Sequence, residues 1–219
     1  MADTPVGNGN YEANAGDCMA SIAAAHGFLM QTLWELPDNA DLKEARKDPY
    51  ILLPGDLVSI PDIEKQEIAC ATDSTYNFVL QTDPEKLQLV INDDEGNPVA
   101  NTPYRLEIDG RLKFVGQTDG SGKIKETIQP TAMKGTLEVG DADNHRKYRL
   151  GLGQLNPIDT VSGAQARLLN LGFYLGPVNG RLDLATRTAM VLFQEAMKMT
   201  PTGENDGDTQ AKLKSAHGC

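Results

Sequence analysis

The spacing of hydrophobic residues changes twice along this chain, and this restricts the fold more than any other feature of the sequence. The middle of the chain, about residues 85–150, alternates apolar and polar residues as β-strands do. Turn signals such as Asp109-Gly110 interrupt that alternation about every ten residues. The segments on either side carry apolar residues at helical spacing. Because 219 residues can form two or three small domains, we expect a multi-domain α+β protein.

Two polar segments are expected to separate the modules. One contains the turn-rich run from Ala71 to Thr75, and the other combines Gly151, Gly153 and Pro157, which disfavour regular structure. Short strands with frequent turns are typical of a small β-sandwich, which we expect in the middle module. The expected modules are residues 1–63, 85–150 and 158–219, with linkers at residues 64–84 and 151–157.

The formal net charge of −11 is distributed unevenly. Residues 1–63 contain three basic and ten acidic residues, a net charge of −7, whereas residues 151–219 contain six of each. The acidic balance opposes broad contact with nucleic-acid phosphates. No apolar run approaches the ~20 residues of a membrane span. We therefore expect neither nucleic acid nor a membrane span.

The first residues have neither the basic nor the apolar stretch of a secretory signal, so we expect synthesis in the cytoplasm without a signal peptide. In that compartment cysteines are normally reduced. The cysteines and histidines follow no metal-ligand spacing, so we expect no metal site and no cofactor. The thiols expected to be reduced are those of Cys18, Cys70 and Cys219.

The first module has the pattern of a β-α-α-β unit. Apolar spacing predicts a helix over residues 18–26, with Asp17 as its N-cap. A second helix is expected over about residues 38–47, capped by Asp38 or Asn39. A proline-glycine turn then leads into a short closing strand.

This order of residues resembles a LysM domain. The resemblance rests on Tyr11, Gly16-Asp17, Ser21-Ile22-Ala23, Gly27, Leu33-Trp34, Asn39 and Pro54-Gly55-Asp56-Leu57-Val58-Ser59-Ile60-Pro61. It implies a ligand groove formed by Gly16, Asp17, Cys18, Met19, Tyr50, Ile51, Leu52 and Pro54. For Trp34, Ile51 and Leu52 we favour a place in the hydrophobic core over a place in the groove.

The segment between Trp34 and Pro54 is longer than in wall-binding LysM domains. In this respect the module resembles the LysM-like modules encoded with contractile injection machines, which can hold a protein instead of a glycan. The sequence leaves both ligands open.

The middle module resembles transthyretin-like domains. The residues concerned are Asp94-Glu95-Gly96-Asn97-Pro98-Val99, Tyr104-Arg105-Leu106 and Gly116-Gln117-Thr118-Asp119-Gly120-Ser121-Gly122-Lys123. Similar domains lie at the C-termini of VgrG-type spike proteins and in cargo of type VI secretion systems. We expect Asp119 to organise its turn and not to bind calcium, because no second cluster of oxygen ligands is spaced for it.

The last module is expected to contain three helices. Helical spacing predicts the first from residue 163 until Gly172 breaks it, and the second over residues 184–197. The third is expected over residues 209–215, with Asp208 as its cap. The residues expected on the buried faces of the first two helices are Ala166, Leu169 and Phe173, then Ala185, Ala189, Leu192 and Phe193.

This module resembles the PG_binding_1 type of peptidoglycan-binding domain over residues 158–216. The residues that carry the resemblance are Leu168-Leu169, Leu171-Gly172-Phe173-Tyr174, Gly176-Pro177-Val178-Asn179-Gly180, Thr186, Ala189, Phe193-Gln194, Thr202-Gly203, Asp206, Thr209 and Leu213. Asn179 replaces the usual Asp, and Asp183 the usual Gly. The wall-contacting surface implied by the resemblance consists of Tyr174, Gly176, Pro177, Asn179, Gly180 and Arg181. We expect the glycines to fix the turn, and Tyr174 and Arg181 to expose polar ends.

No pattern of catalytic residues accompanies these modules. We therefore expect a non-enzymatic, peptidoglycan-binding adaptor of a type VI secretion or related contractile injection machine, which docks spike or cargo proteins and the cell wall. Such a machine could deliver it to the periplasm of a target cell. The alternative is a phage or phage-like baseplate or tail component, in which the LysM-like module clamps another protein. An accessory to a secreted lytic enzyme fits less well. The identity of the partner and the oligomeric state stay open.

Overall fold

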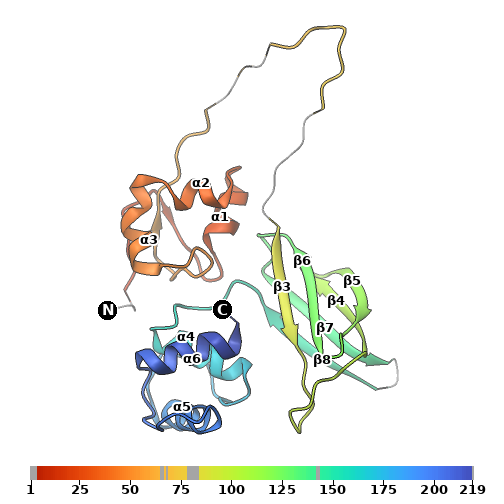
Figure 1. The fold of residues 1–219 in the computed structure, drawn as a ribbon. Coiled ribbons are helices and arrows are strands. Elements are labelled where there is room, and N and C mark those ends of the chain that lie inside the picture. The colour runs from red at the N-terminus through yellow and green to blue at the C-terminus, as the bar shows by residue number, and fades with distance from the viewer. Residues whose placement is uncertain (1–3, 65–66, 68, 78–83, 142–143, 219) are drawn as a thin grey trace.

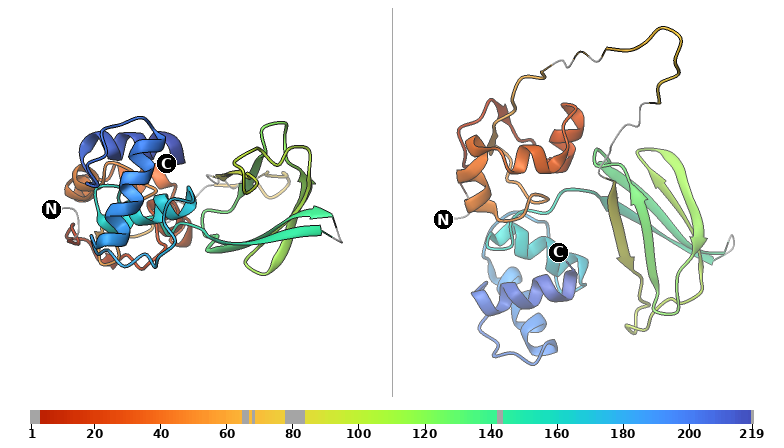
Figure 2. Two further views of the ribbon diagram at one scale, coloured as in Figure 1. Left: turned by 90° about the horizontal axis from the view of Figure 1, so that it is seen from below. Right: turned by 45° about the horizontal axis from the view of Figure 1, so that its top comes forward.

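The computed structural model describes residues 4–64, 67, 69–77, 84–141 and 144–218. It has the expected mixed α+β architecture, and buried hydrophobic residues form one cluster in each of three regions. Figure 1 shows these regions in red to orange, in yellow to green, and in cyan to blue, and Figure 2 shows them from two further directions. None of the helices in the described part of the chain could cross a membrane. We call the three regions the N-terminal region (residues 4–64), the sheet region (84–152) and the C-terminal region (153–218).

The N-terminal region contains more helical elements than the sequence predicts. Its elements are β1 (Tyr11–Glu12), α1 (Met19–Ala25), α2 (Met30–Trp34), a 3-10 helix η1 (Pro37–Asn39), α3 (Ala40–Arg46) and β2 (Leu57–Val58). The two short strands pair antiparallel. The helix α2 was not predicted, and α3 begins later than predicted because a 3-10 helix that starts with proline precedes it.

The predicted N-cap of the first helix is wrong, and the prediction for the second helix is right only in its position, Asn39. Cys18, not Asp17, is the N-cap residue of α1. The Asp17 carboxylate instead accepts a hydrogen bond from the Tyr11 hydroxyl at 2.9 Å. Asn39 is at the N-cap of α3, but its side chain donates to Ser59 O at 3.0 Å and accepts from Ser59 N–H at 2.7 Å. The Asp17 side chain therefore holds the nearby strand β1, and the Asn39 side chain holds the distant segment that follows β2.

A buried ion pair joins α3 to the turn before β2. Arg46 Nε donates to Asp56 Oδ2 at 2.8 Å, and Arg46 Nη2 lies 2.6 Å from Asp56 Oδ1. The two side chains are only 2% and 0% exposed. Asp56 also accepts hydrogen bonds from the N–H groups of Val6 and Leu53, at 2.9 and 2.8 Å. The carboxylate is thus fully engaged, as a buried charge must be.

The sheet region consists of two antiparallel sheets that share one hydrophobic cluster. Its strands are β3 (Glu85–Val90), β4 (Pro103–Ile108), β5 (Arg111–Gln117), β6 (Lys123–Ile128), β7 (Lys134–Asp141) and β8 (Asn144–Gly151). One sheet pairs β3 with β6, and the other has the order β5-β4-β7-β8. Leu106 and Leu137 of the larger sheet and Ile124 of the smaller one are almost completely buried in this cluster.

A hydrogen bond between side chains links the two sheets. The hydroxyl of Tyr104, on β4, donates to the Glu126 carboxylate, on β6. Burial of the hydroxyl, together with the hydrogen bond and the charge of Glu126, raises the pKa of Tyr104 to about 12. The small size of Gly116 makes room for this hydroxyl, because a Cβ there would lie 2.8 Å from it.

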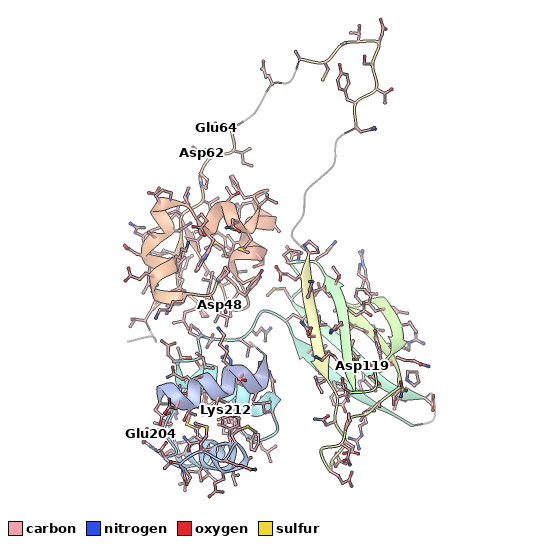
Figure 3. The ribbon with its side chains drawn as sticks, in the orientation of Figure 1. Asp48, Asp62, Glu64, Asp119, Glu204 and Lys212 are labelled. Carbon is pink, nitrogen blue, oxygen red and sulfur yellow. The ribbon has the colours of Figure 1, made fainter. Side chains whose placement is uncertain are left out.

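Asp119 organises the turn between β5 and β6, as predicted (Figure 3). Its Oδ1 accepts from Ser121 Oγ at 2.7 Å, from Ser121 N–H at 2.8 Å and from Lys123 N–H at 2.9 Å. These hydrogen bonds, chiefly the one from the Ser121 side chain, hold the pKa of Asp119 below its usual value.

The C-terminal region contains α4 (Val161–Asn170), α5 (Leu184–Ala196) and α6 (Gly207–His217). Asp183 caps α5, and Asp206 caps α6 in place of the predicted Asp208. Each carboxylate accepts the backbone N–H of the residue three positions later, at 2.9 and 2.8 Å. These hydrogen bonds lower the pKa of both carboxyl groups. The cap lies two residues earlier than predicted, so α6 also begins earlier.

The buried faces of α4 and α5 differ from the prediction. Leu169 and Leu192 are 41% and 48% exposed, and Ala185 is also exposed. Two polar side chains, Gln165 and Gln194, are instead completely buried. Apolar spacing alone predicts the wrong buried face, because it takes buried polar residues such as these two glutamines to be exposed.

Candidate functional site

One buried side chain fixes the loop between α4 and α5, which we call the α4–α5 loop (residues 171–183). Gln165 Oε1 accepts hydrogen bonds from the N–H groups of Asn179 and Gly180, at 3.0 and 2.9 Å. Gln165 Nε2 donates to Arg181 O at 3.0 Å. Gly180 has a φ of 70°, which favours glycine. The amide of Gln165 therefore holds the backbone at the tip of this loop from inside the helical core.

The loop between α5 and α6 (residues 197–206) is held in the same way. Gln194 Oε1 accepts from Gly203 N–H at 2.9 Å, and Gln194 Nε2 donates to the hydroxyls of Thr202 and Thr209, at 2.9 and 2.8 Å. Gly203 has a φ of 69°, close to that of Gly180. The C-terminal region thus repeats one arrangement of four residues. Its two copies are Gln165, Gly180, Asp183 and Thr186, then Gln194, Gly203, Asp206 and Thr209.

The two copies differ in the charge that follows the loop glycine. Glu204 follows Gly203 and forms an ion pair with Arg187 (Figure 3 labels Glu204). Arg181 follows Gly180; it is exposed, and it forms no salt bridge with any residue that the structure describes. The α4–α5 loop therefore presents a cation that can bind an anion outside the chain.

Tyr174 does not expose its polar end, so that expectation is wrong. The residue is 3% exposed, and its ring packs in the cluster of the C-terminal region. Its hydroxyl donates to Pro177 O at 3.0 Å. Gly176 lies against this hydroxyl, and a Cβ there would lie only 2.6 Å from it. Tyr174 and Gly176 therefore shape the loop from within.

The exposed part of the α4–α5 loop combines polar and apolar groups. Pro177, Asn179 and Arg181 are exposed, as the proposed wall-contacting surface requires. Leu175 and Leu184, which were not predicted as part of this surface, are 94% and 81% exposed. The sequence feature that could have indicated them is a large aliphatic residue in a predicted loop or in the first turn of a predicted helix. Together with Pro177, they add exposed apolar side chains to this loop and to the first turn of α5.

The residues of the expected LysM groove are divided between the core and the surface. Cys18, Met19, Ile51 and Leu52 are buried. Trp34 is buried as well, which agrees with the core position favoured for it, for Ile51 and for Leu52. The surface part of the groove consists of Gly16, Asp17, Tyr50 and Pro54.

Other regions of the chain lie against part of this groove. A Cβ on Gly16 would lie 2.6 Å from the Cε atom of Met133, and one on Gly153 would lie 2.6 Å from Gly16 O. The Asp48 carboxylate lies 3.7 Å from Lys214 Nζ on α6, and Figure 3 shows Asp48 on the side of the N-terminal region that faces this helix. The chain itself therefore limits access to the groove at Gly16.

Within the described ranges, no three His, Cys, Asp or Glu side chains gather as metal ligands would. Cys18 and Cys70 carry free thiols, and burial raises the pKa of the Cys18 thiol. Cys219, also expected to be reduced, lies outside the described residues.

Comparison with known families identifies the C-terminal region. Residues 159–213 match the family described as "Putative peptidoglycan binding domain" (PG_binding_1), and the match contains both glutamine-held loops. The search of curated proteins found no match, and neither did the search of solved structures. The C-terminal region thus contains a peptidoglycan-binding domain, which indicates binding to the cell wall and is consistent with a non-enzymatic protein.

Proposed function

We propose that this protein binds peptidoglycan through the exposed surface of the α4–α5 loop, with Arg181 as its central contact. The observation that carries the proposal is the family match over residues 159–213, on a loop whose arginine has no ion-pair partner among the described residues. The peptide stems of peptidoglycan carry free carboxylates. Arginine binds carboxylates with two parallel hydrogen bonds, which gives both strength and direction.

The neighbouring residues of the loop would complete the contact. Leu175 and Pro177 offer an apolar surface for the methyl groups of the peptide stem or the faces of the sugar rings. Gln165 and Tyr174 act as positioning residues, because they hold the loop without reaching the surface. A loop held in advance loses little conformational entropy on binding.

Co-sedimentation of the full-length protein with purified peptidoglycan sacculi tests this proposal. Arg181→Ala should weaken binding several-fold, since it removes the exposed cation. Lys212→Ala is the matched control: it removes one positive charge from the exposed surface of α6 (Figure 3) and should leave binding unchanged. Equal binding by Arg181→Ala and the wild type would exclude the assigned surface. Failure of the wild-type protein to sediment would exclude wall binding itself.

We further propose that the protein is an adaptor of a type VI secretion or related contractile injection machine. The LysM-like N-terminal region would hold a spike, cargo or tail protein, and the transthyretin-like sheet region would contribute to the same docking. Two observations favour a protein over a glycan as the ligand of the N-terminal region: its net charge of −7 and its long segment between Trp34 and Pro54. Delivery by the machine would bring the protein to the periplasm of a target cell.

A pull-down with the full-length protein as bait tests the adaptor role. It should recover a spike or tail protein, and raised salt should release it, because salt screens attraction between exposed charges over ~8 Å at physiological ionic strength. Recovery of phage tail-assembly proteins would favour the alternative, a baseplate or tail component. Salt-insensitive binding of glycan oligomers to the N-terminal region would contradict the protein-clamp role.

A further inference from the structure

A cavity of about 300 Å³ opens in the sheet region, between the ends of the two sheets. Ile108 of β4, Phe114 of β5 and Ile128 of β6 form its apolar wall, together with Ala132 from the segment that follows β6. This volume is at the lower end of the range for pockets that bind small molecules. The cavity therefore suits a small ligand with an apolar body.

A β-bulge brings a basic side chain to this cavity. Leu106 pairs with Phe114 and Glu107 pairs with Leu112, so Lys113 has no partner residue on β4. In a regular strand, neighbouring side chains point to opposite faces. Lys113 and Phe114 nevertheless both line the cavity, because the bulge redirects the strand between them.

The charged groups of the cavity leave it with a positive edge. Arg111 and Lys113 both line it and are exposed, and neither forms a salt bridge with a residue in the described ranges. Asp109 is the acidic residue of the lining. Its Oδ1 lies 3.3 Å from Met133 N and 3.2 Å from Lys134 N, so its carboxylate is engaged by backbone N–H groups. Because the lining has two positive side chains and one carboxylate that backbone N–H groups already engage, it favours an anionic ligand.

We propose that this cavity binds a small amphipathic carboxylate. The apolar chain of the ligand would lie against Ile108, Phe114 and Ala132, and its carboxylate would accept hydrogen bonds from Arg111 and Lys113. Such a site is separate from the α4–α5 loop and independent of wall binding.

Calorimetric titration of the full-length protein with octanoate, octanol and octylamine tests the proposal. Octanoate should bind at least about fivefold more tightly than the other two compounds, because only its head group is attracted by both cations. The double variant Arg111→Ala/Lys113→Ala should weaken octanoate binding by about tenfold, since each exposed ion pair is worth up to about fivefold in affinity. Its affinity for octanol should not change.

A matched double variant controls for the loss of two charges. Lys86→Ala/Lys125→Ala removes two exposed cations from β3 and β6 that do not line the cavity, and it should bind octanoate like the wild type. Ala132→Phe should fill the cavity and abolish binding, with circular dichroism confirming that the protein is folded. Equal affinity for the three compounds, equal octanoate binding by the two double variants, or no binding at millimolar concentrations would each overturn the proposal.

Discussion

Replacing Gln165 by leucine should release the α4–α5 loop while the helices stay folded. The Gln165 side chain accepts two backbone hydrogen bonds, from Asn179 and Gly180, and donates to Arg181 O and, at 2.8 Å, to Thr186 Oγ1. Each such bond is worth about 1 kcal/mol net, and burial of the leucine returns about 1 kcal/mol. The expected loss in the free energy of unfolding of the C-terminal region is therefore about 3 kcal/mol.

Gln194→Leu is the matched control, because the Gln194 side chain holds the loop between α5 and α6 in the same way. Both variants should lose about 3 kcal/mol, which raises the equilibrium constant for local opening by roughly a hundredfold. Hydrogen exchange followed by mass spectrometry measures this change in the three helices. Co-sedimentation with sacculi at low temperature, where both variants are folded, should show weaker binding for Gln165→Leu only.

Two outcomes would refute this reasoning. If Gln194→Leu weakened sacculus binding as much as Gln165→Leu, general destabilisation and not the geometry of one loop would explain the loss. If Gln165→Leu lost less than about 1 kcal/mol, its hydrogen bonds would not hold the loop as the structure indicates.

Arg46→Ala should lower the free energy of unfolding by about 3–5 kcal/mol, because it leaves the Asp56 carboxylate buried without its counter-charge. Urea denaturation followed by the fluorescence of the single tryptophan, which lies in the hydrophobic cluster of the N-terminal region, measures this loss, and a loss below about 1 kcal/mol would contradict the prediction. The raised pKa of Tyr104 contributes stability that is complete below its unfolded value of 10.0 and is lost as the pH rises through about 12. Tyr104→Phe should remove this contribution, so the free energy of unfolding, measured by urea denaturation, should fall less between about pH 9 and about pH 11 in the variant than in the wild type. An equal fall in both proteins would show that the Tyr104–Glu126 contact is not responsible. The full-length protein should release no soluble fragments from labelled sacculi, with or without zinc, and release that Glu195→Gln abolishes would show that it is an enzyme.

Local sequence patterns correctly predicted the elements whose formation is set by residues close together in the chain. The mixed α+β class, the strands on either side of Asp109-Gly110, the turn at Asp119 and the course of α5 were all predicted and are found, within a few residues at their ends. Tight turns and amphipathic elements depend on residues within a few positions of each other, so the sequence alone is informative about them. The peptidoglycan-binding family was recognisable for the same reason, because its motifs are short and lie close together over residues 159–213.

The tertiary structure alone decided which polar side chains are buried and what they hold. Gln165 and Gln194 look like ordinary polar helix residues in the sequence, but the fold buries them and pairs each with the loop that follows its helix. Asp17 looked like a helix cap but accepts a hydrogen bond from Tyr11, and Asn39 occupies a cap position but its side chain bonds to Ser59. Tyr174 looked like an exposed contact and is in the core. A hydrogen bond between distant segments forms only when the fold brings its two groups together, so residue spacing cannot predict it.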